Sequence, residues 1–264
     1  MQAYSLYTDV DGTLVCDGAV SPENRAALEE LVAAGGRFSV ATGRSELGMD
    51  QYLKDLPINL PAILYNGAAV YDFAKGVFLH RELLPPQLAE RLLYTAMRFD
   101  RRIGVHAFTG GPTRILRPGD RPDPYLVKER PPTQPSTVQA ALDAGCIKLL
   151  FHSAVSRLPK LEKALRLAVP EGGYILTYSA PYYLEVLPQE ASKGDALKWI
   201  VGHLHLSHKR LAAIGDYEND VSMLKYAPYS AAPEDAHDKA RTAAKWIVAP
   251  HTQHAVADFI HRLP

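Results

Sequence analysis

The stretch LYTDVDGTLV, residues 6–15, decides the fold of this chain. Its apolar beginning predicts a buried strand over residues 3–9, which runs directly into two aspartates, Asp9 and Asp11, separated by one residue. On an extended chain, side chains at i and i+2 point to the same side. Two neighbouring carboxylates repel, so the arrangement costs stability unless a cation lies between them or one carboxyl keeps its proton. The end of this strand is therefore a candidate functional site.

The residues around this stretch alternate between strand and helix patterns. Ser21 and Pro22 are typical of the N-cap and first position of a helix, which Gly35 and Gly36 end. Strands are predicted over residues 37–41 and 62–65, with a helix over 45–54 between them. After Pro188 the pattern returns, with helices over 194–204 and 220–226 and strands over 211–214 and 246–248. This alternation predicts a parallel sheet with helices on its faces.

A different pattern lies between residues 83 and 188. It begins with a helix from Pro86 to about residue 99, and further helices are predicted near 136–143 and 157–168. Short strand patterns follow one another over 103–108, 114–116, 125–128, 147–152, 174–177 and 183–187. We therefore expect a Rossmann-like, doubly wound α/β core formed by residues 1–82 and 189–264, interrupted by an inserted α+β cap domain at 83–188.

Composition limits the classes of partner. The 264 residues carry 29 basic and 29 acidic side chains, so the formal net charge is zero. Such a chain has no basic field to recruit nucleic acid or an anionic membrane, and we expect neither as a partner. The separate cysteines Cys16 and Cys146 fit free thiols in a reducing compartment. With no leader pattern and no apolar run long enough to span a bilayer, a cytoplasmic protein is expected, as a monomer or a homodimer.

Three further polar stretches follow predicted strands or open predicted helices: Thr42-Gly43-Arg44, Ser192-Lys193-Gly194 and the run from Gly215 to Asp220. Ligands of open α/β sheets bind beyond the carboxyl ends of the strands, so these stretches can converge on one crevice. The residues after Asp9 do not fit an EF-hand, because its fifth, sixth and twelfth positions hold Thr13, Leu14 and Val20. Gly43 and Gly48 have the spacing of a P-loop but lack the Lys that must follow.

In this order, the four motifs resemble those of the haloacid dehalogenase superfamily. The insertion, together with Asn66-Gly67-Ala68 and Ser192-Lys193-Gly194-Asp195, is similar to the Cof-like sugar-phosphatase branch with its type-II (IIB) cap. The resemblance covers essentially the whole chain. One departure is Glu190-Ala191, where the branch commonly has Gly-Val before Ser-Lys-Gly.

The resemblance implies a mechanism. Asp9 would attack phosphorus and form an aspartyl-phosphate, while Asp11 would act as general acid and then as general base. A Mg²⁺ ion would offset the repulsion between these carboxylates and the phosphate. Its implied ligands are Asp9, the main-chain carbonyl of Asp11, Asp216 and Asp220, the last either as a ligand or as an anchor behind the metal.

The resemblance also implies the residues that hold the substrate. Thr42 and Gly43 would bind phosphate oxygens with help from Asn219, and Lys193 would neutralise charge beside Asp9. Arg44 and Asn66 are further candidates for substrate binding. In the cap, His106, Tyr182 and Tyr183 are candidates for contacts with a sugar hydroxyl.

The function that follows is a Mg²⁺-dependent phosphatase of small phosphate monoesters, with sugar phosphates as the expected substrates. Two alternatives stay open at this point. A phosphomutase of the same fold would return the phosphoryl group to another hydroxyl. A non-catalytic protein could use the crevice to sense a phosphorylated metabolite.

Overall fold

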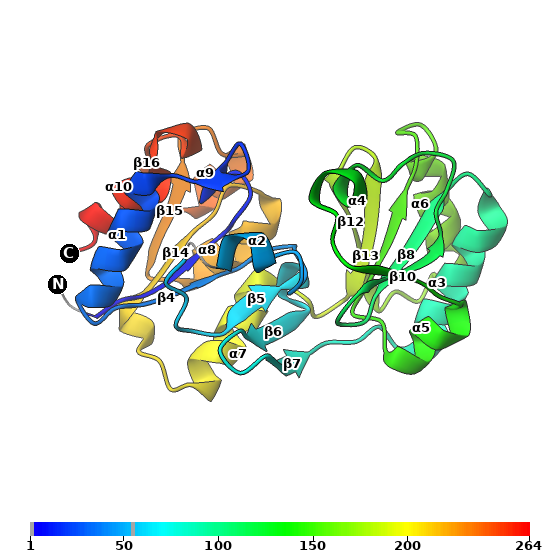
Figure 1. Cartoon of the computed structure of the whole chain (residues 1–264), viewed down its shortest axis with the longest axis horizontal. Coiled ribbons are helices and arrows are strands. Elements are labelled where there is room, and N and C mark those ends of the chain that lie inside the picture. The colour runs from blue at the N-terminus through cyan, green and yellow to red at the C-terminus, as the bar shows by residue number, and fades with distance from the viewer. Residues whose placement is uncertain (1–2, 54–55) are drawn as a thin grey trace. The chain divides into compact units, whose positions relative to one another are not determined.

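A computed structural model describes residues 3–53 and 56–264 (Figure 1). The chain forms two compact units. The first, called the core unit here, comprises Met1–Arg44, Met49–His80 and Ser192–Pro264. The second, called the inserted unit, comprises Ser45–Gly48 and Arg81–Ala191. No helix within the described ranges is long and apolar enough to cross a membrane.

The core unit is built on a five-stranded sheet in the order β16-β15-β14-β1-β4, with all neighbours parallel. Its strands are β1 (Ser5–Thr8), β4 (Arg37–Val40), β14 (Leu211–Ile214), β15 (Tyr229–Pro233) and β16 (Trp246–Val248). The first strand lies between β4 and β14, with Thr8 opposite both Val40 and Ile214. The loops that follow these three strands therefore leave the sheet at the same edge.

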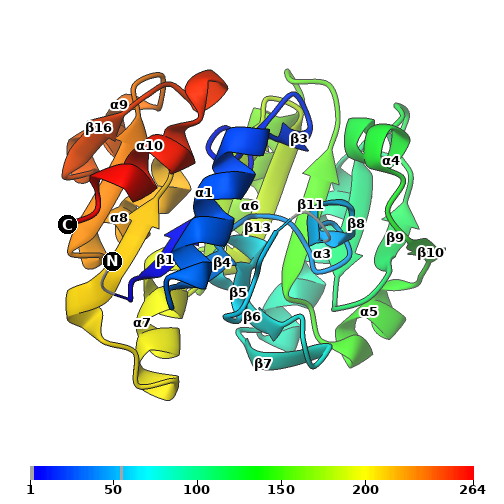
Figure 2. The ribbon, with the colours of Figure 1, turned by 60° about the vertical axis from the view of Figure 1, so that its left-hand side comes forward.

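Helices cover both faces of this sheet, as a doubly wound fold requires. On one face α1 (Pro22–Ala33) packs against α10 (Ala255–Arg262), as Figure 2 shows. Three further helices are α7 (Lys193–His203), α8 (Val221–Tyr226) and α9 (Asp238–Ala243). Each packs against the next, and their apolar side chains contribute to one buried cluster. The predicted N-cap of the first helix is confirmed, because the Ser21 hydroxyl accepts a hydrogen bond from the Asn24 N–H.

Beyond β4 the chain forms a three-stranded sheet. Its first strand confirms the strand predicted over 62–65, but the sequence patterns did not predict its other two strands or the antiparallel pairing of the first two. It consists of β5 (Ala62–Leu64), β6 (Ala69–Asp72) and β7 (Val77–Arg81), and a tight turn over Tyr65–Gly67 joins its first two strands. The helix predicted over 45–54 is wrong for most of its length, since only α2 (Asp50–Leu53) is helical and Lys54 lies outside the described residues. A small hairpin of β2 (Val15–Cys16) and β3 (Ala19–Val20) follows the first aspartates.

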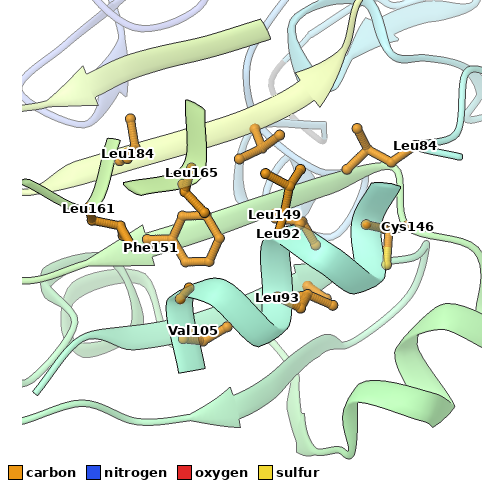
Figure 3. Packing of buried hydrophobic residues seen from close by; sticks show 14 of the residues in the cluster. Leu84, Leu92, Leu93, Val105, Cys146, Leu149, Phe151, Leu161, Leu165 and Leu184 are labelled. Atoms are coloured by element: carbon orange, nitrogen blue, oxygen red, sulfur yellow. The ribbon is translucent and has the colours of Figure 1, made fainter. Parts of the chain in front are cut away.

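The inserted unit has its own six-stranded sheet, in the order β10-β9-β8-β11-β13-β12. The strands are β8 (Gly104–Phe108), β9 (Thr113–Arg117), β10 (Thr133–Pro135), β11 (Lys148–His152), β12 (Tyr174–Ala180) and β13 (Tyr183–Pro188). The helices α3 (Pro86–Phe99), α5 (Val138–Ala144) and α6 (Leu158–Ala168) pack on one face of this sheet. Figure 3 shows apolar side chains of α3 and α6, such as Leu92 and Leu161, near Leu149 and Phe151 of the sheet.

One strand predicted in this unit is wrong. Residues 125–128 belong to the helix α4 (Pro124–Glu129). The Asp123 carboxylate accepts hydrogen bonds from the N–H groups of Tyr125 and Leu126, and Pro124 occupies the first turn. Asp followed by Pro is a helix-start signal that outweighs the β-propensity of Tyr and Val. The predicted α/β core with a separate inserted α+β cap sheet is nevertheless confirmed.

Candidate active site

The paired strands β1 and β14 bring distant carboxylates together. Asp9 directly follows β1, and its N–H donates to the Ile214 carbonyl of β14 at 2.9 Å. Asp216 lies two residues beyond that carbonyl, and Asp220 begins the approach to α8. Carboxylate oxygens of Asp9, Asp216 and Asp220 all lie within 4.8 Å of one another. The sheet therefore builds an acidic cluster at the predicted edge.

Lys193 holds this cluster together. It is the first residue of α7 and is fully buried, and its ammonium donates to Asp9 Oδ1 and to Asp220 Oδ1, at 2.6 Å each. The helix starts here because the Ser192 hydroxyl accepts a hydrogen bond from the Asp195 N–H at 3.0 Å. Gly194 allows α7 to pack closely, since a Cβ at this position would lie 2.6 Å from the Ser222 main chain. Packing thus places a lysine at the positive end of a helix, where only its carboxylate partners make it favourable.

The charges in the cluster do not balance. Burial raises the pKa of Asp9 well above its usual range, and although Lys193 opposes this, Asp220 and Asp216 reinforce it. Burial and the neighbouring Asp220 also raise the pKa of Asp216. For Lys193, burial lowers the pKa, but the two carboxylates outweigh burial and the pKa is raised. A site with three close carboxylates and one ammonium suits a further cation.

Asp220 also orders the loop that carries Asp216. Its Oδ2 accepts hydrogen bonds from the N–H groups of Asp216 and Tyr217, at 3.0 Å each. Gly215 leaves room for this contact, because a Cβ there would lie 2.4 Å from the Asp220 carboxyl carbon. Both oxygens of Asp220 are thus engaged in holding Lys193 and the loop.

Thr13 is a site residue to which sequence reasoning gave no role. Its hydroxyl donates to Asp216 Oδ1 at 2.8 Å and so fixes that carboxylate. The neighbouring Gly12, with φ of +84°, brings the main chain close to the other oxygen, since a Cβ there would lie 2.7 Å from Asp216 Oδ2. Gly12 and Thr13 are the last two residues of the motif Asp-Val-Asp-Gly-Thr. Their role could not be predicted from the motif, because it depends on contacts with Asp216, which lies 203 positions from Thr13 in the sequence.

A second group of predicted residues meets where β4 and β5 end. Thr42 is buried, its N–H donates to the Ile63 carbonyl at 2.8 Å, and its hydroxyl accepts from the Arg44 N–H at 3.2 Å. Asn66 adopts the left-handed region, with φ of 58°, and its side-chain oxygen accepts from Asn219 Nδ2 at 2.9 Å. Gly43 lies against the side-chain amide of Asn66. The structure therefore brings Thr42, Gly43, Asn66 and Asn219 into one neighbourhood.

Asp11 and Arg44 form a bidentate ion pair. Arg44 Nε donates to Asp11 Oδ2 and Nη2 donates to Oδ1, both at 2.7 Å. The Asp11 side chain is 56% exposed, whereas that of Arg44 is 12% exposed and lies over the Tyr52 ring. The two aspartates of the opening stretch therefore have different surroundings. Asp9 is buried and contacts the Lys193 ammonium, whereas Asp11 is exposed to solvent and contacts the Arg44 guanidinium.

Gly67 is a second residue that sequence reasoning left without a role. It has φ of +101°, and a Cβ there would lie 2.1 Å from the Ser192 carbonyl oxygen and 2.7 Å from the Lys193 nitrogen. The turn after β5 is therefore packed directly against the start of α7. Glu190, the departure from the family pattern, has an exposed side chain.

Comparison with known proteins identifies the family. The family model of haloacid dehalogenase-like hydrolases matches residues 6–260, so the chain belongs to this family. A putative phosphatase of Streptococcus pyogenes is 28% identical over 96% of this chain and 96% of its own length. The HMP-PP phosphatase of Serratia proteamaculans is 32% identical over 82% of this chain and 78% of its own. The 5-amino-6-(5-phospho-D-ribitylamino)uracil phosphatase of Bacillus subtilis is 26% identical over 97% and 96%.

Solved structures share the fold. A haloacid dehalogenase-like hydrolase from Bacteroides thetaiotaomicron superposes with a TM-score of 0.87 at 24% identity, covering 99% of both chains. The subclass IIB sugar phosphatase BT4131 superposes with a TM-score of 0.80 at 19% identity, covering 97% of this chain and 96% of its own. The chain is thus a phosphatase of the haloacid dehalogenase type, as its motifs predicted.

Proposed function

We propose that this protein is a Mg²⁺-dependent phosphatase that hydrolyses small phosphate monoesters, chiefly sugar phosphates, through an aspartyl-phosphate on Asp9. The buried contact between Lys193 and Asp9 carries this proposal. An ammonium on one carboxylate oxygen leaves the other oxygen to attack phosphorus, and the ammonium charge offsets that of an incoming phosphate.

The acidic cluster fits a magnesium ion. Its donors are all carboxylate oxygens, which Mg²⁺ prefers, and burial, reinforced by the neighbouring carboxylates, raises the pKa values of Asp9 and Asp216. Asp9, Asp216 and the main-chain carbonyl of Asp11 are the proposed ligands. Asp220 acts as the anchor, because both its oxygens already hold other groups. When bound, the ion would neutralise charge on the phosphoryl oxygens.

The protein's own residues then carry out two displacements. In the first, a carboxylate oxygen of Asp9 forms a bond to phosphorus, the ester P–O bond breaks, and Asp11 gives its proton to the leaving oxygen. In the second, Asp11 takes a proton from water, the water oxygen bonds to phosphorus, and the bond to Asp9 breaks. Phosphate leaves, Asp9 is again a carboxylate, and Asp11 is again protonated.

Arg44 is the proposed link between substrate binding and Asp11. Its guanidinium forms a bidentate pair with the Asp11 carboxylate. An anionic substrate would compete for the guanidinium and so release the Asp11 side chain toward the leaving oxygen. This keeps Arg44 as a substrate-binding residue that also positions Asp11.

The group at the ends of β4 and β5 is the proposed phosphate cradle. The Thr42 hydroxyl and the Gly43 N–H would hold phosphate oxygens, as would the Asn219 amide, which Asn66 orients. In this proposal the inserted unit is the cap, and the residues that select the leaving group belong to it. Sugar phosphates are favoured because the chain shares its fold with a subclass IIB sugar phosphatase.

Phosphate release tests the proposal. The substrate panel contains hexose and pentose phosphates, 5-amino-6-(5-phospho-D-ribitylamino)uracil, HMP-PP, nucleotides and an aryl phosphate. Release should require Mg²⁺ and stop with a chelator or with Asp9→Asn, whereas Asp143→Asn, which alters an exposed aspartate of α5, should leave it unchanged. No release from any compound by folded protein with Mg²⁺ would overturn the proposal. Isomerised sugar phosphate without free phosphate would instead indicate a mutase.

A further inference from the structure

A cluster of buried polar side chains lies in the inserted unit. His106 is on β8, His152 is on the neighbouring β11, and Asp123 is the N-cap of α4. Their residues are 1%, 3% and 6% exposed, respectively. The histidine ring centroids are 4.9 Å apart, and candidate ligand atoms from all three residues lie within 4.8 Å of one another. The cluster belongs to none of the groups in the candidate active site.

The strand register places both histidines on the face of the sheet opposite α3, α5 and α6. Their neighbours Val105 and Phe151 point into the helix-covered apolar core. In the antiparallel pair β8–β11, His152 lies opposite Gly104 and is thus a diagonal neighbour of His106. Gly104 makes the arrangement possible, because a Cβ there would lie 1.8 Å from His152 Nε2. Any other residue at position 104 would displace the His152 ring.

Two nitrogens of the cluster are unsatisfied. Among the described residues, neither His106 Nε2 nor His152 Nε2 has a hydrogen-bond partner, although both atoms are buried. In a neutral imidazole either ring nitrogen can carry the lone pair, so each unpartnered Nε2 can serve as a ligand atom. Burial favours the neutral form of both rings and lowers their pKa values, that of His106 to about 4 with the help of His152. Buried polar atoms without partners are unfavourable, and two in one cluster call for a ligand.

Asp123 completes the donor set. Its Oδ1 accepts hydrogen bonds from the Tyr125 N–H at 2.8 Å and from the Tyr183 hydroxyl. Its Oδ2 instead faces His106, with Nδ1 at 3.4 Å. Because Nδ1 faces this carboxylate, Nε2 is the His106 atom that lacks a partner. The contacts at Oδ1 orient the carboxylate as outer partners orient metal ligands.

We propose that His106, His152 and Asp123 bind one transition-metal ion of the zinc type, with the fourth coordination position facing a cavity. That cavity has a volume of about 290 Å³, and His106, Asp123, Leu126 and the loop over residues 118–122 line it. Neutral imidazole with carboxylate is a donor set of zinc rather than of magnesium. The ion would tie the 118–123 loop to the sheet and hold a water molecule or a ligand atom in the cavity.

Cobalt is the probe for this site. Metal-free protein is titrated with Co²⁺ in excess Mg²⁺, so that magnesium competes for the carboxylate cluster of the core unit. One equivalent should give the intense visible absorption of tetrahedral Co²⁺ without a thiolate band, and Zn²⁺ should displace it because it binds such sites more tightly. No tetrahedral spectrum from the wild-type protein would overturn the proposal without any variant.

Variants assign the signal to the cluster. His152→Gln and Asp123→Asn should each weaken Co²⁺ binding by roughly 100-fold or more. Asp123→Asn also guards against misfolding, because Asn is an equally good N-cap for α4. His261→Gln, which changes an exposed histidine of α10, and Asp216→Asn in the core unit should leave the signal intact. Unchanged Co²⁺ binding in His152→Gln and Asp123→Asn, or loss of the Co²⁺ signal in Asp216→Asn, would refute the proposed metal site. This conclusion holds whatever the outcome of the phosphatase assay.

Discussion

Replacing Lys193 with Met tests whether the ammonium holds the acidic cluster together. The Lys193 and Asp220 side chains are fully buried and that of Asp9 is 9% exposed, so water cannot replace the lost partner. Removing one partner of a buried ion pair destabilises by about 3–5 kcal/mol, because it leaves an uncompensated charge. Lys193 serves two carboxylates at 2.6 Å, so the loss should reach the upper part of that range.

Urea unfolding in the presence of a chelator measures this loss in the free energy of unfolding. In thermal unfolding, a loss of that size corresponds to a lowering of Tm by roughly 10 °C. The matched control is Lys198→Met, five residues along α7, where the lysine and its partner Asp195 are both more than half exposed. Such a surface pair contributes at most about 1 kcal/mol.

The deficit should depend on pH in a defined direction. Without the ammonium, the pKa of Asp9 rises further, so the folded variant binds more protons than the folded wild-type protein. Its stability therefore falls as pH rises, and the gap between variant and wild type should narrow between pH 7 and pH 5. A Lys193→Met protein within 1 kcal/mol of wild type at pH 7, or a gap that widens on acidification, would refute this account of the site.

Three further predictions concern packing and ionisation. Gly67→Ala should lower kcat/KM by about 100-fold in the phosphate-release assay, because its Cβ must push the main chain at Ser192 and displace Lys193. Gly202→Ala, with no atom of the described residues within 4 Å of its added Cβ, should retain full activity. Phe151→Ala should lower the free energy of unfolding by about 3–5 kcal/mol, measured in urea, because it opens a cavity in the fully buried core of the inserted unit. Burial raises the pKa of the Cys146 thiol to about 11, so the folded state keeps a proton that the unfolded state loses above pH 9. Stability should therefore fall between pH 9 and pH 11 more steeply in the wild-type protein than in Cys146→Ala, and parallel pH profiles would contradict this.

Local sequence signals accounted for much of the fold. Ser21 before Pro22 marked the start of α1, and the apolar run before Asp9 marked the central strand, because caps and buried strands depend on residues close together in the chain. The prediction of a strand over residues 125–128 was wrong, because Asp123-Pro124 begins a helix there. The strands β2, β3, β6, β7, β10 and β15 were not predicted, because their pairing partners rather than their own residues stabilise them.

By itself, the sequence determined which side chains are available at the candidate site, and it predicted their chemistry. Asp9, Lys193 and Asp216 stand at strand ends and helix starts that their neighbours specify, and their order along the chain identified the family. Only the tertiary structure decided how they are paired: Lys193 reaches Asp9 across 184 positions, and Asp11 pairs with Arg44 instead. It alone brought His106, Asp123 and His152 together. The physical reason is that side-chain contacts and burial depend on distance in space, whereas a sequence pattern reports only neighbours along the chain.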